Sequence, residues 1–115
     1  MSKFFIGSET VKVSFDDGEW VEIKQEFTQS DKDYISTQMM QTKIDLGSKK
    51  QAELEMKLGK QATLERAIVA WSFVEDGQSV PVTPDNISNL RNKYRAKVLS
   101  EIDRLDAEAG AFAKN

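Results

Sequence analysis

The stretch LERAIVAWSFVEDGQSVPVTPDNISNL, residues 64–90, carries three local structural signals in close succession. Apolar residues from Leu64 to Trp71 recur at three- and four-residue spacing, which is typical of an amphipathic helix. The Asp76-Gly77 dipeptide that follows favours a tight turn. Thr83-Pro84-Asp85 then has the chemistry of a helix start, because it supplies a hydroxyl cap, a proline for the first helical position and an acid near the positive end of the helix dipole. The stretch therefore predicts a helix, a turn and a second helix.

The helix that starts at Thr83 is expected to run through the carboxy-terminal third of the chain, over about residues 84–107. Its apolar stripe consists of Ile87, Leu90, Tyr94, Val98, Ile102 and Leu105. Asn92 could cap a second helix if the first is interrupted at Arg91-Asn92, so one helix and two helices are both open. Residues 108–115 offer little apolar area to offset the entropy of ordering them, and we expect this tail to fray.

The amino-terminal part of the chain predicts a β-hairpin over about residues 11–24. Alternating apolar residues flank the sequence Asp16-Asp17-Gly18, which has the composition of a turn. Thr28 or Ser30 can then cap a helix, and the apolar spacing extends this helix over about residues 29–43.

Residues 51–58 give two conflicting signals. Their apolar side chains alternate strictly with Glu53, Glu55 and Lys57, which favours a strand, although most of these residue types prefer a helix. We interpret the segment as a possible further strand. A short helix over about residues 61–71 follows it.

Together these elements predict one small α+β domain over residues 1–115, in which the hairpin and the possible further strand pack against three or four helices. A length of 115 residues with 39% apolar residues allows only a modest core. The chain has no cysteine, so neither a disulfide nor a thiolate-bound metal can supplement that core. Self-association is therefore expected.

The composition argues against an enzyme. Without histidine or cysteine, the most common proton shuttle, the thiolate nucleophile and two common metal ligands are missing. The acids between Asp16 and Glu22 lack the spacing of a calcium loop, and the sequence around Gly59-Lys60 lacks the first glycine and the hydroxyl residue of a phosphate-binding loop. We expect no catalytic, cofactor-binding or metal-binding residues and no small-molecule substrate.

The net charge of −3 gives no general attraction for nucleic acid or for an anionic membrane surface. No apolar run is long enough to cross a bilayer, and the amino terminus lacks the pattern of a secretion signal. We therefore expect the protein to stay in the cytoplasm in which it is made.

The residues most suited to contact another protein fall into three groups. They are Trp20, the methionines Met39, Met40 and Met56, and the cluster Arg91, Lys93, Tyr94, Arg95 and Lys97. The tryptophan can belong to the core or anchor an interface. The methionines can fill gaps in the core, which is the favoured interpretation, or coat a variable apolar partner. The basic cluster is favoured as solvated helix surface, but it could also meet a phosphate backbone or an acidic patch, such as the hairpin of a neighbouring copy.

Residues 64–90 resemble the pattern of small tail-assembly chaperones and related tail-morphogenesis proteins of tailed bacteriophages. In that group a short apolar helix ends in a tryptophan, an acidic-glycine turn follows, and a Thr-Pro-acid step leads into a helix that ends in leucine. The corresponding residues here are Trp71, Asp76-Gly77, Thr83-Pro84-Asp85 and Leu90. The hairpin from Val11 to Lys24 and the helix start at Thr28 also resemble the opening of such proteins.

The resemblance implies a non-enzymatic protein of the infected cell that binds the long tape-measure protein and helps tail-tube subunits polymerise around it. Such a protein would work in the host cytoplasm and would not be retained in the virion. An alternative is a virion structural protein of the head-tail connector or of tail completion, which would use the same domain as a ring subunit. A less favoured alternative is a small nucleic-acid-binding regulator that uses the face from Arg91 to Lys97.

Overall fold

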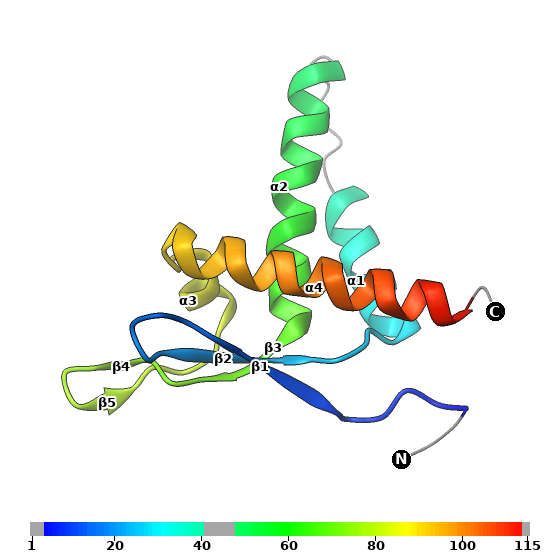
Figure 1. The fold of residues 1–115 in the computed structure, drawn as a ribbon. Coiled ribbons are helices and arrows are strands. Elements are labelled where there is room, and N and C mark those ends of the chain that lie inside the picture. Colours follow the sequence, from blue (N-terminus) through cyan, green and yellow to red (C-terminus); the bar gives the residue numbers. More distant parts are fainter. Residues whose placement is uncertain (1–3, 41–47, 114–115) are drawn as a thin grey trace.

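The computed structural model describes residues 4–40 and 48–113 of the chain (Figure 1). Within these residues the fold is α+β, with four helices, a three-stranded antiparallel sheet and a separate two-stranded hairpin. The elements in chain order are β1 (Thr10–Ser14), β2 (Trp20–Lys24), α1 (Gln29–Met40), α2 (Ser48–Ala67), β3 (Ile68–Trp71), β4 (Val74–Glu75), β5 (Gln78–Ser79), α3 (Pro84–Ser88) and α4 (Asn92–Ala113). The predicted α+β class and the amino-terminal hairpin are confirmed.

The sheet has the strand order β1, β2, β3, and each strand is antiparallel to its neighbour. Val13 and Val21 lie opposite each other in the β1–β2 hairpin, and Ile23 of β2 pairs with Ile68 of β3. All four side chains are buried and form the contribution of the sheet to the core. Gly18 closes the hairpin turn with a φ of +87°, a conformation that glycine adopts without a steric cost.

The prediction of a possible strand over residues 51–58 is wrong, because this segment belongs to helix α2. Glutamate, leucine, lysine, methionine and alanine are all good helix formers, and here their propensity prevails over the alternating pattern. In the helix Leu54 and Leu58 lie one turn apart on its half-buried side, whereas Met56 is exposed.

The helix predicted over residues 61–71 ends earlier than expected. Helix α2 stops at Ala67, and Ile68–Trp71 form strand β3 beside β2. The β-branched pair Ile68-Val69 favours a strand, and pairing with β2 gives its backbone groups hydrogen-bond partners. The helical spacing of the apolar residues was therefore misleading at the end of the segment.

The helix start at Thr83 has the predicted geometry. The hydroxyl of Thr83 accepts a hydrogen bond from the Asn86 amide at 3.2 Å, and Pro84 is the first residue of α3. This cap satisfies one of the amide groups that have no partner within the helix.

The helix expected over residues 84–107 is divided into two. Helix α3 ends at Ser88 and α4 begins at Asn92, so the interrupted form is the observed alternative. Helix α4 continues to Ala113, and the fraying of the tail from residue 108 stays a prediction. The first helix, α1, covers residues 29–40 of the predicted 29–43, and residues 41–43 lie outside the described part of the chain.

The core lies where one end of α2 meets the sheet together with α3 and α4. Its buried residues are Val13, Val21, Ile23, Leu64, Ala67, Ile68, Ile87, Val98 and Ile102. In Figure 1, α2 rises steeply away from the sheet with α1 beside it, and α4 crosses the lower part of α2. The paired helices α1 and α2, which we call the helical hairpin, therefore project from the rest of the molecule.

Candidate functional site

The basic cluster of α4 is bound largely to its own chain. Lys93 Nζ lies 3.0 Å from Oδ2 of Asp17 in the β1–β2 turn, and the Tyr94 hydroxyl donates a hydrogen bond to the same oxygen. Lys97 Nζ donates to the carbonyl oxygen of Ser14 at the end of β1. The acidic patch considered for this cluster is therefore found in the hairpin of the same chain.

Arg95 is also engaged, but with the helices. One of its guanidinium nitrogens donates to the Ile87 carbonyl oxygen at 2.8 Å and lies 3.2 Å from Oε1 of Gln61. Arg91 is exposed, and within residues 4–40 and 48–113 its side chain has neither a hydrogen bond nor an ion pair. The cluster thus mainly holds α4 in place and leaves Arg91 available.

Asp17 has a pKa lowered to about 2. The main cause is the hydrogen bond from Tyr94, followed by those from the Glu19 amide and from Lys93, all of which favour the ionised carboxylate. The same contact with Asp17 raises the pKa of the Tyr94 hydroxyl and that of Lys93. The carboxylate of Asp17 therefore stays charged over a wide pH range and joins the β1–β2 turn to α4.

Aromatic rings extend in a series from this turn to the end of β3. The ring centroids of Phe15 and Tyr94 are 4.8 Å apart in an edge-to-face arrangement. Tyr94 lies 5.0 Å from Phe73, which in turn lies 5.2 Å from Trp71. The indole N–H of Trp71 donates to the Val80 carbonyl oxygen at 2.6 Å, so the last ring is fixed by its polar atom as well.

A groove of about 680 Å³ lies along these rings, between the β1–β2 turn, the β4–β5 hairpin and the α3–α4 junction. Its apolar lining includes Trp71, Phe73, Val74, Leu90 and Tyr94, and its charged lining consists of Asp17, Glu19, Glu75 and Arg91. Of the residues singled out from the sequence, Tyr94 and Arg91 line this groove. The sequence did not indicate the groove, because its walls come from segments that are far apart in the chain.

Trp20 is not an exposed anchor. Its side chain is half-buried, and Lys12 Nζ lies 4.4 Å from the centroid of its ring. The backbone N–H of Trp20 donates to the hydroxyl oxygen of Ser72 at 2.8 Å, and the Ser72 hydroxyl donates to a carboxylate oxygen of Glu19. Trp20 thus belongs to the join between β2 and the segment that follows β3.

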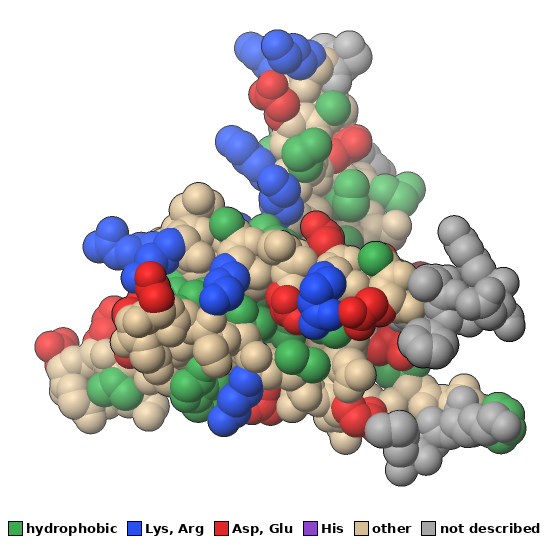
Figure 2. All heavy atoms as spheres, in the orientation of Figure 1, with side chains coloured by type: hydrophobic (Ala, Val, Ile, Leu, Met, Phe, Trp, Pro, Cys, Tyr) green, Lys and Arg blue, Asp and Glu red, His purple; other side chains and the backbone are tan. Residues whose placement is uncertain are grey.

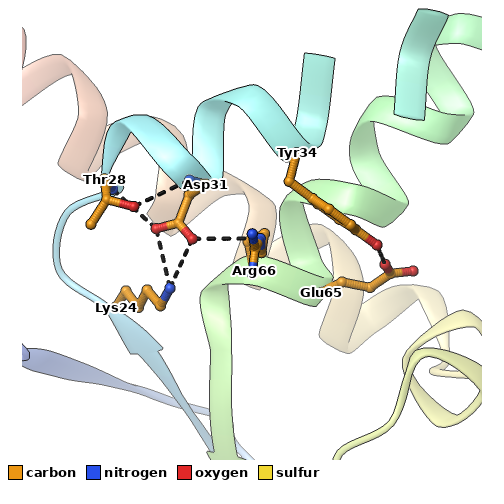
Figure 3. A network of polar contacts seen from close by, with 6 residues as sticks. All are labelled: Lys24, Thr28, Asp31, Tyr34, Glu65 and Arg66. Carbon is orange, nitrogen blue, oxygen red and sulfur yellow. Dashed lines mark hydrogen bonds and ion pairs between the residues drawn. The ribbon is translucent and has the colours of Figure 1, made fainter. Parts of the chain in front are cut away.

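Asp31 is a buried carboxylate, only 2% exposed, at the start of α1 (Figure 3). Its Oδ2 accepts the Thr28 N–H at 3.0 Å, and the Thr28 hydroxyl accepts the Asp31 N–H at 3.1 Å, which is a reciprocal helix cap. Lys24 Nζ lies 2.9 and 3.1 Å from the two carboxylate oxygens, and Arg66 Nε lies 3.6 Å from one of them. Asp31 therefore joins the end of β2, the start of α1 and the last turn of α2.

Burial raises the pKa of Asp31, but the hydrogen bonds from Thr28 and Lys24 outweigh burial and leave the pKa below its usual value. The sequence offered Thr28 or Ser30 as the cap, and Thr28 is the one observed. It gave no sign of Lys24 or Arg66, although the three-residue spacing from Thr28 to Asp31 is a signal for the reciprocal cap.

A second polar link lies beside Asp31 and joins α1 to α2 and α4. The Tyr34 hydroxyl donates to Glu65, which raises the pKa of Tyr34, and the Arg66 guanidinium lies 4.5 Å from the centroid of the Tyr34 ring (Figure 3). Gln61 donates to the other oxygen of Glu65 at 2.9 Å and accepts a hydrogen bond from Arg95. The lower half of the helical hairpin is therefore held by polar contacts as well as by the core.

The three methionines selected from the sequence all lie on the helical hairpin. Met39 is half-buried against Gly59, where an added Cβ atom would lie 3.0 Å from the Met39 Sδ atom. Met40 and Met56 are 75% and 60% exposed. Met39 thus fills a gap between helices, whereas the other two add flexible apolar surface to a projecting element, on which Figure 2 shows hydrophobic side chains among basic and acidic ones.

Among the described residues, no three or more Asp, Glu, His or Cys side chains are grouped so that they could hold a metal ion. In residues 4–40 and 48–113 no helix combines the length and the apolar character needed to cross a membrane.

A scan against family models, a search of curated proteins and a search of solved structures each found no match to this chain. The likeness to phage tail-assembly proteins therefore depends on the sequence motifs alone.

Replacing Asp31 with alanine is expected to lower the free energy of unfolding by roughly 2–3 kcal/mol, because the change removes the reciprocal cap and leaves Lys24 and Arg66 without their carboxylate. Urea unfolding followed by circular dichroism measures this loss. Asp33→Ala, in the same helical turn but exposed, serves as the control and should cost less than about 1 kcal/mol. Equal losses in the two variants would contradict the role given to Asp31.

The stability that Asp17 contributes should depend on pH. The folded pKa of about 2 lies below the ordinary value of 3.8, so the contribution is fully present above pH 3.8 and is lost as the pH falls through 2. The difference in unfolding free energy between the natural protein and Asp17→Asn should therefore be largest at neutral pH and fall steeply between pH 3.8 and about 2. Urea unfolding across this range measures this difference. When both proteins also carry Tyr94→Phe, the difference between their unfolding free energies should be smaller. A difference independent of pH would refute the assignment.

Proposed function

We propose that the protein is a non-enzymatic tail-assembly chaperone of a tailed bacteriophage, which binds the tape-measure protein in the host cytoplasm and assists polymerisation of the tail tube. One observation carries the proposal: Met40 and Met56 are 75% and 60% exposed on a helical hairpin that projects from the sheet. The resemblance of residues 64–90 to such chaperones names the class of partner. The binding surface proposed here consists of Met40, Met56 and the exposed face of α2 around Met56.

This surface suits a helical client with an apolar stripe. Methionine side chains are flexible and polarizable, so they adapt to apolar side chains that vary along the client. On α2 Met56 shares an exposed face with Lys49, Glu53 and Lys60, which lie seven and three residues before it and four residues after it. A client helix with charged residues of both signs beside its apolar stripe would match both properties.

The mechanism requires binding without covalent chemistry. Several copies, associating with one another, would cover the client through weak contacts until tube subunits replace them. The contact of Asp31 with Lys24 holds the lower half of the helical hairpin to β2, and Tyr34 joins its two helices, so its outer part can be presented in a fixed orientation. Weak contacts on a preorganised surface combine recognition with easy displacement.

The alternative of a nucleic-acid-binding regulator loses its main support. Lys93, Arg95 and Lys97 are engaged within the chain, and of the cluster's cations Arg91 is the one without such a contact among the described residues. A single free cation provides little of the electrostatic attraction on which phosphate binding depends.

Co-expression with overlapping fragments of the tape-measure protein from the same phage genome tests the proposal. The natural protein should co-purify with at least one fragment, and the double variant Met40→Ser, Met56→Ser should retain roughly tenfold less of it, since loss of an apolar anchor commonly weakens binding by this amount. Val69→Ser changes an apolar residue that is 44% exposed in β3 and should leave retention unchanged. The proposal would be contradicted if no fragment bound, or if the double variant retained as much of a fragment as the natural protein does.

Mass spectrometry of purified phage particles separates a chaperone from a virion component. A chaperone is released before assembly is complete, so its peptides should be missing from particles in which the tube protein is readily detected. Peptides of this chain in a fixed ratio to the portal or tube protein would instead identify it as a ring subunit of the head-tail connector or of tail completion.

A further inference from the structure

We infer that the groove lined by Trp71, Phe73 and Tyr94 binds an extended segment of a partner protein that presents a lysine or arginine beside an apolar side chain. The groove is separate from Met40 and Met56 and lies near the β4–β5 hairpin, which points in a different direction from the helical hairpin (Figure 1). The inference therefore goes beyond the proposed function and does not depend on it.

The apolar side chains that line the groove are held in place by the core beneath them. Trp71, Phe73 and Leu90 pack against the buried core, and the Trp71 indole N–H is fixed on the Val80 carbonyl oxygen. Val74 adds an apolar side chain that is 58% exposed at the rim. Side chains that are already held in this way, which we call the aromatic floor, lose little conformational entropy when a ligand binds. Apolar contact with them therefore contributes directly to affinity.

The charged lining of the groove is predominantly negative, with three carboxylates against the single guanidinium of Arg91. Lys93 already balances Asp17, but among the described residues the carboxylate of Glu19 accepts from the neutral hydroxyl of Ser72 and has no cation as a partner. Glu75 is exposed and has no ion pair within the described part of the chain. Glu19 and Glu75 therefore lack a cation beside the aromatic floor.

A cation placed between a carboxylate and an aromatic ring is attracted by both. The chain itself contains this arrangement: Lys93 Nζ lies 3.0 Å from Asp17 and 4.8 Å from the centroid of the Tyr94 ring. A ligand side chain of lysine or arginine would make the equivalent contacts with Glu75 or Glu19, while its apolar neighbour would lie on Val74 and the rings. Arg91 can donate to a carbonyl oxygen of the ligand backbone.

The size and charge of the groove favour a peptide over a nucleic acid as its ligand. A volume of about 680 Å³ is suited to a few side chains of an extended peptide. Phosphate groups would be repelled by the carboxylates, which argues against nucleic acid. The favoured occupant is therefore a peptide segment with positive charge.

Titration of the ¹⁵N-labelled protein with capped pentapeptides, followed by NMR, tests the inference. The probes are Ala-Leu-Arg-Leu-Ala and the same peptide with glutamate in place of arginine. The arginine peptide should shift the Trp71 indole signal and the amides of Glu75 and Arg91, and it should bind roughly tenfold more tightly than the glutamate peptide. Raising the salt concentration should weaken its binding.

Two variants of the groove sharpen the test. Glu75→Gln should weaken binding of the arginine peptide by roughly three- to tenfold, and Val74→Arg should weaken it further, because a cation would then occupy the rim. Both positions are exposed, so folding should be preserved. Glu53→Gln on the exposed face of α2 is the matched control and should change nothing.

Three results would overturn the inference: equal or tighter binding of the glutamate peptide, shifts confined to residues outside the groove, or concentration-dependent shifts at the groove without peptide. The last would assign the groove to a second copy of the chain. Retention of tape-measure fragments by Glu75→Gln should match that of the natural protein, so failure of this inference leaves the proposed function untouched.

Discussion

Ala67 and Ile68 connect α2 directly to β3, without a loop, and this junction shapes the molecule. Both residues are buried, at 0% and 5% exposure, so the end of the helix packs directly against the sheet. The helix has 20 residues, and a rise of about 1.5 Å per residue takes its other end far from the core. Helix α1 packs along α2 beyond the sheet, where the missing side chain of Gly59 gives room to Met39. The projecting helical hairpin and its exposed methionines follow from this junction.

Two carboxylates then orient the helices on the sheet. Asp31 is buried and combines a helix cap with contacts to Lys24 and Arg66, so it fixes the helical hairpin. Asp17 is more accessible, and with Lys93 it fixes the start of α4. Exposed ion pairs contribute little to stability, whereas a buried and multiply bonded carboxylate is costly to remove. Asp17 engages Lys93 and Tyr94 of the basic cluster, whereas Arg95 and Lys97 are bound by other groups of the chain, so most of the cluster is not available to a partner.

The two proposed binding surfaces differ in the chemistry they offer. The helical hairpin presents flexible apolar side chains with charged side chains beside them, which suits a long helix whose sequence varies. The groove presents fixed aromatic rings with unbalanced carboxylates, which suits a short extended segment with a basic residue. They share no residues, so a helical client and a basic segment would not compete for the same side chains.

The sequence by itself determined the features that depend on neighbouring residues: the hairpin turn at Asp16-Asp17-Gly18, the cap at Thr83, the turn at Asp76-Gly77 and the helical carboxy-terminal third. It left residues 51–58 ambiguous, because alternation and helix propensity disagreed there, and in the structure the helix propensity prevails within α2. Strand β3 needed β2 as its partner, and the groove needed three separate segments to meet. The contact between Asp17 and Lys93 spans 76 positions and leaves no local pattern, which is why tertiary structure alone decided it.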